Sequence, residues 1–355
     1  MKEKRIALAG LVACALLLPA FGHAQSAGTF PSFIPFSLAQ LEFPEGVAVD
    51  KVGNVYVSIR QSPFGPLPLS DQIWKFSPAG AKTILADFGP PGGGGCGLAV
   101  DAEGNVYMAR TGAAAPYNGV YRVDAAGNIT LIPGTQNIVF PDGLAFDQRG
   151  NLYITEVFSI GPGGFAQGGI WRVPRGGTAE LWLRHDLLTG LAPTLFPFPV
   201  GANGVAFYLG SLYVINTDKA LVVRIPVLPN GNAGQPEVWA EAQDVPESPF
   251  YQSPYFPFML DGLALDVQGN VYIASPSRLA VVRINAADRS QQTVAVFPQA
   301  PLDGPFSLAF GTGMGERQNL FVTSSGLVGA LVPGLPWPGP GLVKLEVGIP
   351  GLPLP

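Results

Sequence analysis

The sequence has few of the residues that build disulfide frameworks or histidine-dependent active sites. Its 355 residues include two cysteines, Cys14 and Cys96, and two histidines, His23 and His185. Cys14 and His23 both lie in the apolar N-terminal segment, so removal of that segment would leave Cys96 without an intramolecular partner. The shortage of histidine argues against a Ser-His-Asp triad, and His185 lies in a region expected to be a surface strand.

Charged residues are also scarce, at 13% of the chain, and the net charge is −5. No basic stripe is present, which excludes the usual electrostatic footprint of a nucleic-acid-binding protein. Beyond the N-terminal segment, no stretch is long and apolar enough to span a membrane. Hydrophobic residues make up 47% of the chain, which is ample for a buried core, and we expect a monomer.

The N-terminal segment has the pattern of a secretory signal peptide. Three basic residues within the first five positions precede an apolar run that ends at Phe21, and small residues follow up to Ala24. This pattern predicts a signal peptide over residues 1–24, cleaved near Ala24, and a secreted or periplasmic mature protein. The alternative is lipid anchoring at Cys14, because residues 11–14 resemble a bacterial lipobox.

One repeated unit organises the rest of the chain. Its first copy spans residues 43–57 and reads as an apolar strand, an Asp-x-x-Gly-Asn turn and a second strand. Further copies begin at Gly97, Gly143, Gly204, Gly262 and Ser307, at intervals of 45 to 61 residues. Such a period is typical of four-stranded blades. It predicts an all-β fold, a six-bladed β-propeller with antiparallel blades, as a single domain over residues 25–355.

The sixth blade lacks a fourth strand of its own after residues 342–347. Residues 33–39 precede the first repeat and stand where that strand is missing, so we expect the N-terminal strand to close the ring and remove a sheet edge. Most long connections, by contrast, fall between second and third strands or between blades. Those connections share one face of a propeller, so we expect a small-molecule substrate or ligand to bind at this long-loop face.

Six residues share one position of the repeat, directly before the innermost strand and beside the central axis. These ring positions are Glu45, Cys96, Asp142, Asn203, Asp261 and Phe306. Several carboxylates around a narrow channel would repel one another unless a cation or protons intervene. Oxygen ligands without histidine favour one hard divalent ion, Ca²⁺ first, with Mg²⁺, Mn²⁺ or Zn²⁺ as alternatives. The competing interpretation is that each residue only caps a local turn.

Other polar residues need separate interpretation. The aspartates of the Asp-x-x-Gly-Asn turns are expected to accept backbone hydrogen bonds and to be structural. Glu156 and Asn216 end second strands on the long-loop face, where they either line the pocket wall or bond to neighbouring loops. Cys96 lies at a ring position but has no histidine to activate it, so a buried small residue is favoured over a catalytic thiolate.

The segments around Glu45, Asn203 and Asp261 resemble the metal-site segments of the senescence marker protein, gluconolactonase and luciferin-regenerating enzyme family, and the repeat resembles NHL-type propellers. The resemblance implies that these three residues bind one divalent ion and that Asp261 acts as general base in the hydrolysis of lactones and related esters. The sequence Pro141-Asp142-Gly143 departs from the family's Asn-Asp-Gly. The resemblance therefore leaves Asp142 to bind the metal or to orient water.

Two functions follow from these observations. The first is a secreted, metal-dependent hydrolase of lactones or related esters, with the metal in the central channel. The second is a non-catalytic secreted propeller that binds a ligand, glycan or protein through its long-loop face, since a propeller fold alone does not define an activity. A strictosidine-synthase-like activity would use the same architecture, but no residue pattern singles it out.

Overall fold

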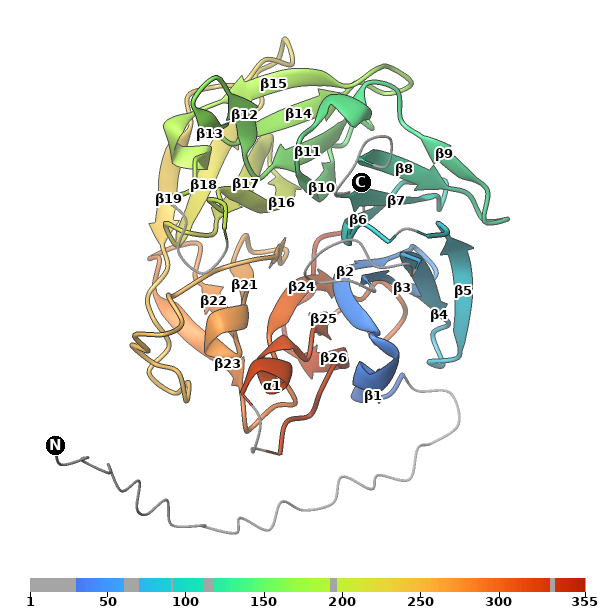
Figure 1. Ribbon diagram of the computed structural model, residues 1–355, viewed down its shortest axis with the longest axis vertical. Coiled ribbons are helices and arrows are strands. Elements are labelled where there is room, and N and C mark those ends of the chain that lie inside the picture. The colour runs from blue at the N-terminus through green and yellow to red at the C-terminus, as the bar shows by residue number, and fades with distance from the viewer. Residues whose placement is uncertain are drawn as a thin grey trace, which may run out of the picture.

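The computed structural model describes residues 30–60, 70–90, 92–111, 118–191, 197–332 and 336–354. Within these ranges, six four-stranded antiparallel sheets surround a central axis (Figure 1). The predicted six-bladed β-propeller is therefore confirmed. The described residues include no helix that is long and apolar enough to cross a membrane.

The blades follow one another along the chain, and the innermost strand of each comes first among its repeat strands. Blade 1 contains β2 (Phe43–Val49), β3 (Val55–Arg60), β4 (Gln72–Phe76) and β5 (Lys82–Asp87). Blade 2 contains β6 (Gly95–Val100), β7 (Val106–Arg110), β8 (Gly119–Val123) and β9 (Ile129–Leu131). Blade 3 contains β10 (Pro141–Phe146), β11 (Leu152–Glu156), β14 (Gly169–Val173) and β15 (Glu180–Arg184). Blade 4 contains β16 (Ala202–Tyr208), β17 (Ser211–Asn216), β18 (Leu221–Pro226) and β19 (Glu237–Glu241). Blade 5 contains β20 (Leu263–Leu265), β21 (Val271–Ser275), β22 (Ala280–Ile284) and β23 (Gln291–Val296).

The sixth blade joins the two ends of the propeller. It contains β24 (Pro305–Phe310), β25 (Asn319–Ser324), β26 (Gly341–Glu346) and the N-terminal β1 (Phe33–Pro35). β1 pairs with β26 in antiparallel register, Ile34 opposite Leu342. The predicted closure by the N-terminal strand is confirmed, although β1 is shorter than residues 33–39 because the chain turns into a 3₁₀ helix at Leu38–Gln40.

The Asp-x-x-Gly-Asn turns are held by their own aspartates, as predicted. Asp50 Oδ1 accepts hydrogen bonds from the backbone N–H groups of Val52 (3.0 Å) and Asn54 (2.9 Å). Its Oδ2 accepts from the amide of Asn54 and from the Tyr56 hydroxyl. The turns that begin at Asp101, Asp147 and Asp266 repeat this arrangement. These carboxylates are therefore satisfied locally and are structural.

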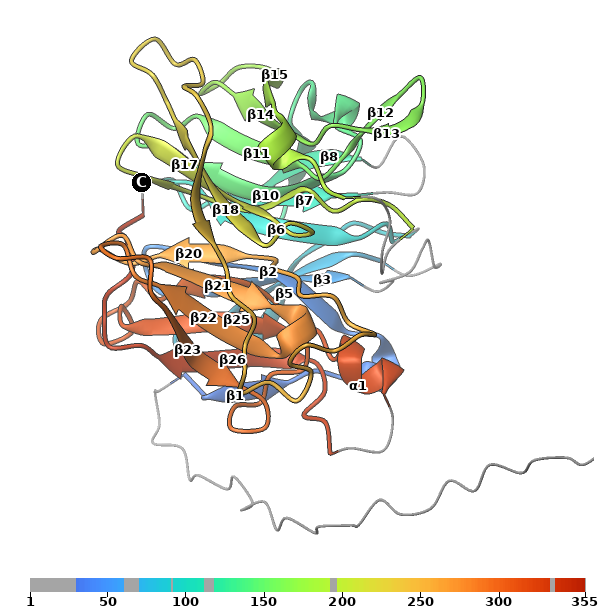
Figure 2. The same ribbon diagram turned by 90° about the vertical axis from the view of Figure 1, so that its left-hand side faces the viewer.

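The two faces of the ring differ (Figure 2). One face carries connections between second and third strands: the hairpin β12 (Ser159–Gly161) with β13 (Gly164–Ala166), the 3₁₀ helix Pro276–Arg278, and α1 (Leu327–Leu331). The opposite face carries the first-to-second turns and the C-terminal segment, which contacts such a turn because Val267 N–H donates to the carbonyl of Pro350 (2.9 Å). These described connections thus lie at the face where the innermost strands begin.

Apolar side chains fill the spaces between adjacent blades. One cluster combines Ile215 and Val222 of blade 4 with Ile273 and Val282 of blade 5, all fully buried. A second cluster combines Tyr272 of blade 5 with blade-6 residues. Since burial of an aliphatic side chain stabilises by about 1.5–3 kcal/mol, these interfaces make each blade depend on its neighbours and hold the innermost strands at fixed distances around the axis.

Candidate metal centre

A β-bulge presents the ring residue in most blades. The pairing between the first two strands shifts by one residue between Pro44 and Val47, and the same shift occurs at Cys96, Asp142, Asn203 and Phe306. A bulge adds one residue on one strand, which bends that strand and redirects a side chain. In blade 5, β20 begins only after Asp261, whose backbone N–H still bonds to the carbonyl of Ala274 (3.0 Å).

Hydroxyl side chains satisfy the polar groups that the bulges leave unpaired. Ser58 Oγ accepts a hydrogen bond from Gly46 N–H and donates to the carbonyl of Cys96, both at 2.7 Å. Thr155 accepts from Gly143 N–H (2.7 Å), and Thr323 accepts from Ser307 N–H (3.0 Å). The bulges of blades 1, 3 and 6 are therefore fixed by a hydroxyl from the second strand of their own blade.

Glycine follows the ring residue in five blades because the next blade approaches there. A Cβ atom on Gly204 would lie 2.5 Å from the carbonyl oxygen of Asp261. We predict that Gly204→Ala lowers the free energy of unfolding by about 1–3 kcal/mol, as expected for overpacking against backbone. Gly163→Ala is the matched control, because a Cβ there meets nothing within 4 Å. Urea denaturation of both variants tests this, and equal stabilities would contradict the account.

Three ring residues converge in the channel. One ligand atom from each of Glu45, Cys96 and Asp142 lies within 4.8 Å of the other two, and all three side chains are buried. The guanidinium of Arg60 joins them: Nη1 lies 3.1 Å from Glu45 Oε2, and Nη2 donates to Cys96 Sγ at 2.9 Å. The ring positions deduced from the repeat therefore bring two carboxylates and a thiol together around the guanidinium of Arg60.

Burial and mutual repulsion raise the carboxyl pKa values. The pKa of Asp142 rises to about 7, first because of burial and then because of the charge of Glu45. Burial raises the pKa of Glu45, and Arg60 partly opposes that shift. The pKa of Asp261 rises well above its ordinary value because of burial and the charges of Asp142 and Glu45. Asp261 thus shares the electrostatic field of the cluster, although it is not one of the three residues that meet within 4.8 Å.

The surroundings of Cys96 disfavour its thiolate. Burial raises the pKa of the thiol well above its ordinary value; the charge of Arg60 opposes this shift, and the carboxylates of Asp142 and Glu45 add to it. The arrangement does not produce a thiolate nucleophile, since a reactive cysteine needs a lowered pKa.

Asn203 and Asp261 differ in how their side chains are engaged. Asn203 is buried and its amide nitrogen donates to the hydroxyl of Thr217 at 3.1 Å. The carboxylate of Asp261 makes no hydrogen bond within the described part of the chain, whereas its carbonyl accepts from Gly204 N–H at 3.2 Å. The backbone of Asp261 therefore links blades 4 and 5, and its carboxylate remains available for chemistry.

Glu156 and Asn216 hold loops. The carboxylate of Glu156 accepts from Arg184 (2.6 Å), the Trp171 indole (3.0 Å) and the backbone N–H of Val139 (2.8 Å). The amide nitrogen of Asn216 donates to the carbonyls of Leu187 and Thr189, both at 2.9 Å. Of the two roles considered for these residues, the observed contacts match loop attachment.

The charges of the cluster fit a divalent cation. Three carboxylates, Glu45, Asp142 and Asp261, share a buried site with one guanidinium, so their full ionisation leaves two negative charges uncompensated. Carboxylate oxygens are the ligands preferred by Ca²⁺, Mg²⁺ and Mn²⁺, whereas the sulfur of Cys96 suits a softer ion such as Zn²⁺. The residues therefore form a group that could hold a metal ion.

Comparisons with known proteins show which family part of the chain resembles. Residues 201–326 match the model of the SMP-30/Gluconolactonase/LRE-like region. The resemblance to that family is confirmed. The matched region contains Asn203 and Asp261, but Glu45 and Asp142 lie outside it. A search of curated protein sequences found no match.

Several solved structures share the propeller fold. A calcium-binding protein, regucalcin, from Agrobacterium tumefaciens has a TM-score of 0.63 and 17% identity, covering 94% of this chain and 99% of that chain. A luciferin-regenerating enzyme has a TM-score of 0.60 and 16% identity, with coverages of 89% and 96%. A gluconolactonase from Xanthomonas campestris has a TM-score of 0.58 and 17% identity, with coverages of 88% and 87%. At these identities the likeness shows a shared propeller fold.

Arg60 is the residue of the cluster that the sequence did not reveal. It lies at the end of β3, opposite Phe43 in the strand pairing, and not at a ring position. No other blade places an equivalent cation among the ring side chains described here, so the repeat gives no signal for it. The predicted signal peptide and Cys14 lie outside the described residues.

Proposed function

We propose that the protein is a metal-dependent hydrolase of lactones or related esters, with one divalent ion in the central channel and Ca²⁺ as its first candidate. The observation that carries this proposal is the convergence of Glu45, Asp142 and Cys96 within 4.8 Å, beside Asp261. The family match over residues 201–326 supports the reaction class.

In this proposal, Glu45, Asp142 and Asp261 hold the ion with Asn203, and the long-loop face admits the substrate. A bound divalent ion supplies a Lewis acid that polarises the ester carbonyl. The Asp261 carboxylate, which has no hydrogen bond within the described residues, accepts a proton from the attacking water. Arg60 fixes the orientation of Glu45 through their 3.1 Å ion pair and offsets one of the negative charges. The ring glycines keep these groups at a constant spacing.

Metal binding makes a direct prediction for stability. A ligand that binds only the folded protein stabilises it by about 2.7 kcal/mol at a concentration 100 times its Kd. We therefore expect Ca²⁺ or Mn²⁺ to raise the melting temperature of the dialysed protein by several degrees. Asp142→Asn should remove most of that increase, whereas Glu103→Gln, on an exposed turn, should retain it. Identical metal responses of the two variants would contradict the proposed site.

The reaction class is tested by assaying a panel of aliphatic and sugar lactones with Ca²⁺, Mg²⁺, Mn²⁺ and Zn²⁺. Turnover that depends on an added ion and is lost after chelation is expected. If the protein binds metal but shows no turnover above background with any ion, the hydrolase proposal is wrong and only a ligand-binding role remains.

Arg60 favours a second candidate function, a non-catalytic propeller. Its guanidinium already bonds to Glu45 and Cys96, which provides an internal cation. In this alternative the long-loop face binds a ligand, glycan or protein. Metal analysis after dialysis separates the two candidates, because only the hydrolase requires about one ion per chain.

We also propose export of the protein through residues 1–24. N-terminal sequencing of protein from culture medium or periplasm should begin near Gln25, and an intact N-terminus in the cytoplasm would contradict this.

A further inference from the structure

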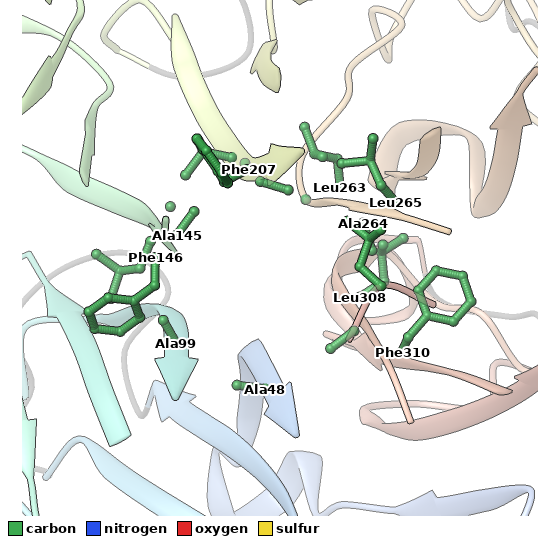
Figure 3. Close-up of a pocket in the computed structure, with 18 of the residues that line it drawn as sticks. Ala48, Ala99, Ala145, Phe146, Phe207, Leu263, Ala264, Leu265, Leu308 and Phe310 are labelled. Atoms are coloured by element: carbon green, nitrogen blue, oxygen red, sulfur yellow. The ribbon is translucent and has the colours of Figure 1, made fainter. Parts of the chain in front are cut away.

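The opposite end of the channel contains a large apolar cavity. Its volume is about 510 Å³, within the range of sites for small organic molecules. The innermost strands of all six blades line it, from the residues after the ring positions to the first-to-second turns. Figure 3 shows Ala48, Ala99, Ala145, Ala264 and neighbouring apolar residues around the open space. The cavity is distinct from the acidic ring and lies towards the other face.

The repeat places an alanine that lines the cavity on every innermost strand. These six residues are Ala48, Ala99, Ala145, Ala206, Ala264 and Ala309. Together with the backbone of the innermost strands they line the cavity along the axis, and we call this alanine-lined space the bore. Larger apolar residues such as Leu263, Phe207 and Phe310 form the remaining wall.

The chemistry of the wall defines what can bind. Among the residues that the structure describes, no lysine, arginine, aspartate or glutamate lines the cavity. Its polar side chains are an amide and hydroxyls, those of Gln148, Tyr208, Ser307 and Thr312. A charged ligand would lose its hydration without a partner, whereas an uncharged apolar ligand would gain from the removal of apolar surface from water.

The mouth of the cavity is also apolar. Leu209, on a first-to-second turn, lines the cavity and is 76% exposed. Val52, Val267 and Met314 lie on other first-to-second turns of the same face and are 62%, 43% and 102% exposed. The C-terminal residues Leu352 and Leu354 add a further wall. Exposed apolar groups around a recess mark a site of interaction more often than isolated ones do.

We propose that this cavity is a second binding site, for an uncharged molecule with a long alkyl chain. The chain occupies the alanine-lined bore, and a hydroxyl or ester head group meets Gln148, Tyr208 or Thr312 at the mouth. This site is separate from the proposed hydrolase site and does not depend on a metal ion.

The test uses the mature chain and the uncharged fluorophore N-phenyl-1-naphthylamine, displaced by 1-dodecanol. We expect saturable binding of one fluorophore per chain, unchanged by chelation of metals. Ala264→Phe and, from the opposite blade, Ala99→Phe fill the bore and should weaken binding by about tenfold or more. Ala126→Phe adds the same side chain on an exposed turn and should leave binding unchanged. Melting curves identify any variant that fails to fold. Because two bore variants are used, one of them can still test the proposal if the other does not fold.

Three results would overturn the proposal. The first is absence of saturable fluorophore binding. The second is binding that both folded bore variants retain but Leu209→Ser loses, which would locate the fluorophore on the rim. The third is a dimer whose dissociation is required for binding, since a second copy would then cover the mouth.

Discussion

Asp261→Asn should lower kcat/KM for lactone hydrolysis by about 10²–10⁴-fold, the contribution typical of a positioned general base. In the dialysed, metal-free protein its melting temperature should be unchanged or slightly higher. The carboxylate makes no hydrogen bond within the described residues, and burial together with the charges of Asp142 and Glu45 raises its pKa. A neutral amide of the same shape therefore removes the chemistry without removing a structural contact. Steady-state kinetics and thermal melting test both halves of the prediction.

Asp266→Asn is the matched control, five residues along the same blade. Asp266 is fully buried and accepts hydrogen bonds from the backbone N–H groups of Gln268 and Asn270, the Asn270 amide and the Tyr272 hydroxyl. Loss of bonds to a charged acceptor should cost about 2–4 kcal/mol of stability, while kcat/KM at low temperature stays near the wild-type value. If both variants lose activity equally, Asp261 has no special chemical role.

Deletion of residues 25–40 should lower the melting temperature by about 10 °C or more, or prevent folding. The deletion removes β1 and exposes the edge of β26. It also removes Phe30, which is 3% exposed and packs between Phe76 of blade 1 and Phe321 of blade 6, with ring centroids 6.3 and 4.8 Å away. Loss of a buried phenylalanine alone costs about 3–5 kcal/mol of stability. Each kcal/mol lost lowers the melting temperature of a domain by about two degrees or more.

Point variants distinguish the stability contributed by β1 from that contributed by the buried side chain of Phe30. Phe30→Ala should account for much of the loss, whereas Leu38→Ala, on a half-exposed side chain, should melt close to the wild type. A deletion variant with an unchanged melting curve would show that β1 does not hold the ring closed.

The sequence predicted what the repeat determines. Each copy returns the chain to the axis at the same phase, so the positions of Glu45, Cys96 and Asp142 around one point followed from spacing alone. The structural role of Asp50 and its equivalents was predictable too, because the Asp-x-x-Gly-Asn pattern is local. The closing strand was predictable because one blade lacked a strand and one segment was left over.

The features that the sequence did not reveal are specific to one blade or depend on space between blades. Arg60 reaches the channel from the end of a second strand, and no other copy marks that position as functional. The bulge at Glu45 arises from pairing with β3 and is visible only in the strand register. The apolar cavity depends on alanines that, in one blade at a time, look like ordinary strand residues.

Anomalous diffraction from crystals grown with Mn²⁺ tests most directly whether the channel carboxylates hold a divalent ion. We predict one anomalous peak at the ring, bonded to carboxylate oxygens of Glu45, Asp142 or Asp261, at a metal–oxygen distance of about 2.0–2.6 Å. The contradictory result is a map without an anomalous peak at the ring, in which Arg60 still bonds to both Glu45 and Cys96.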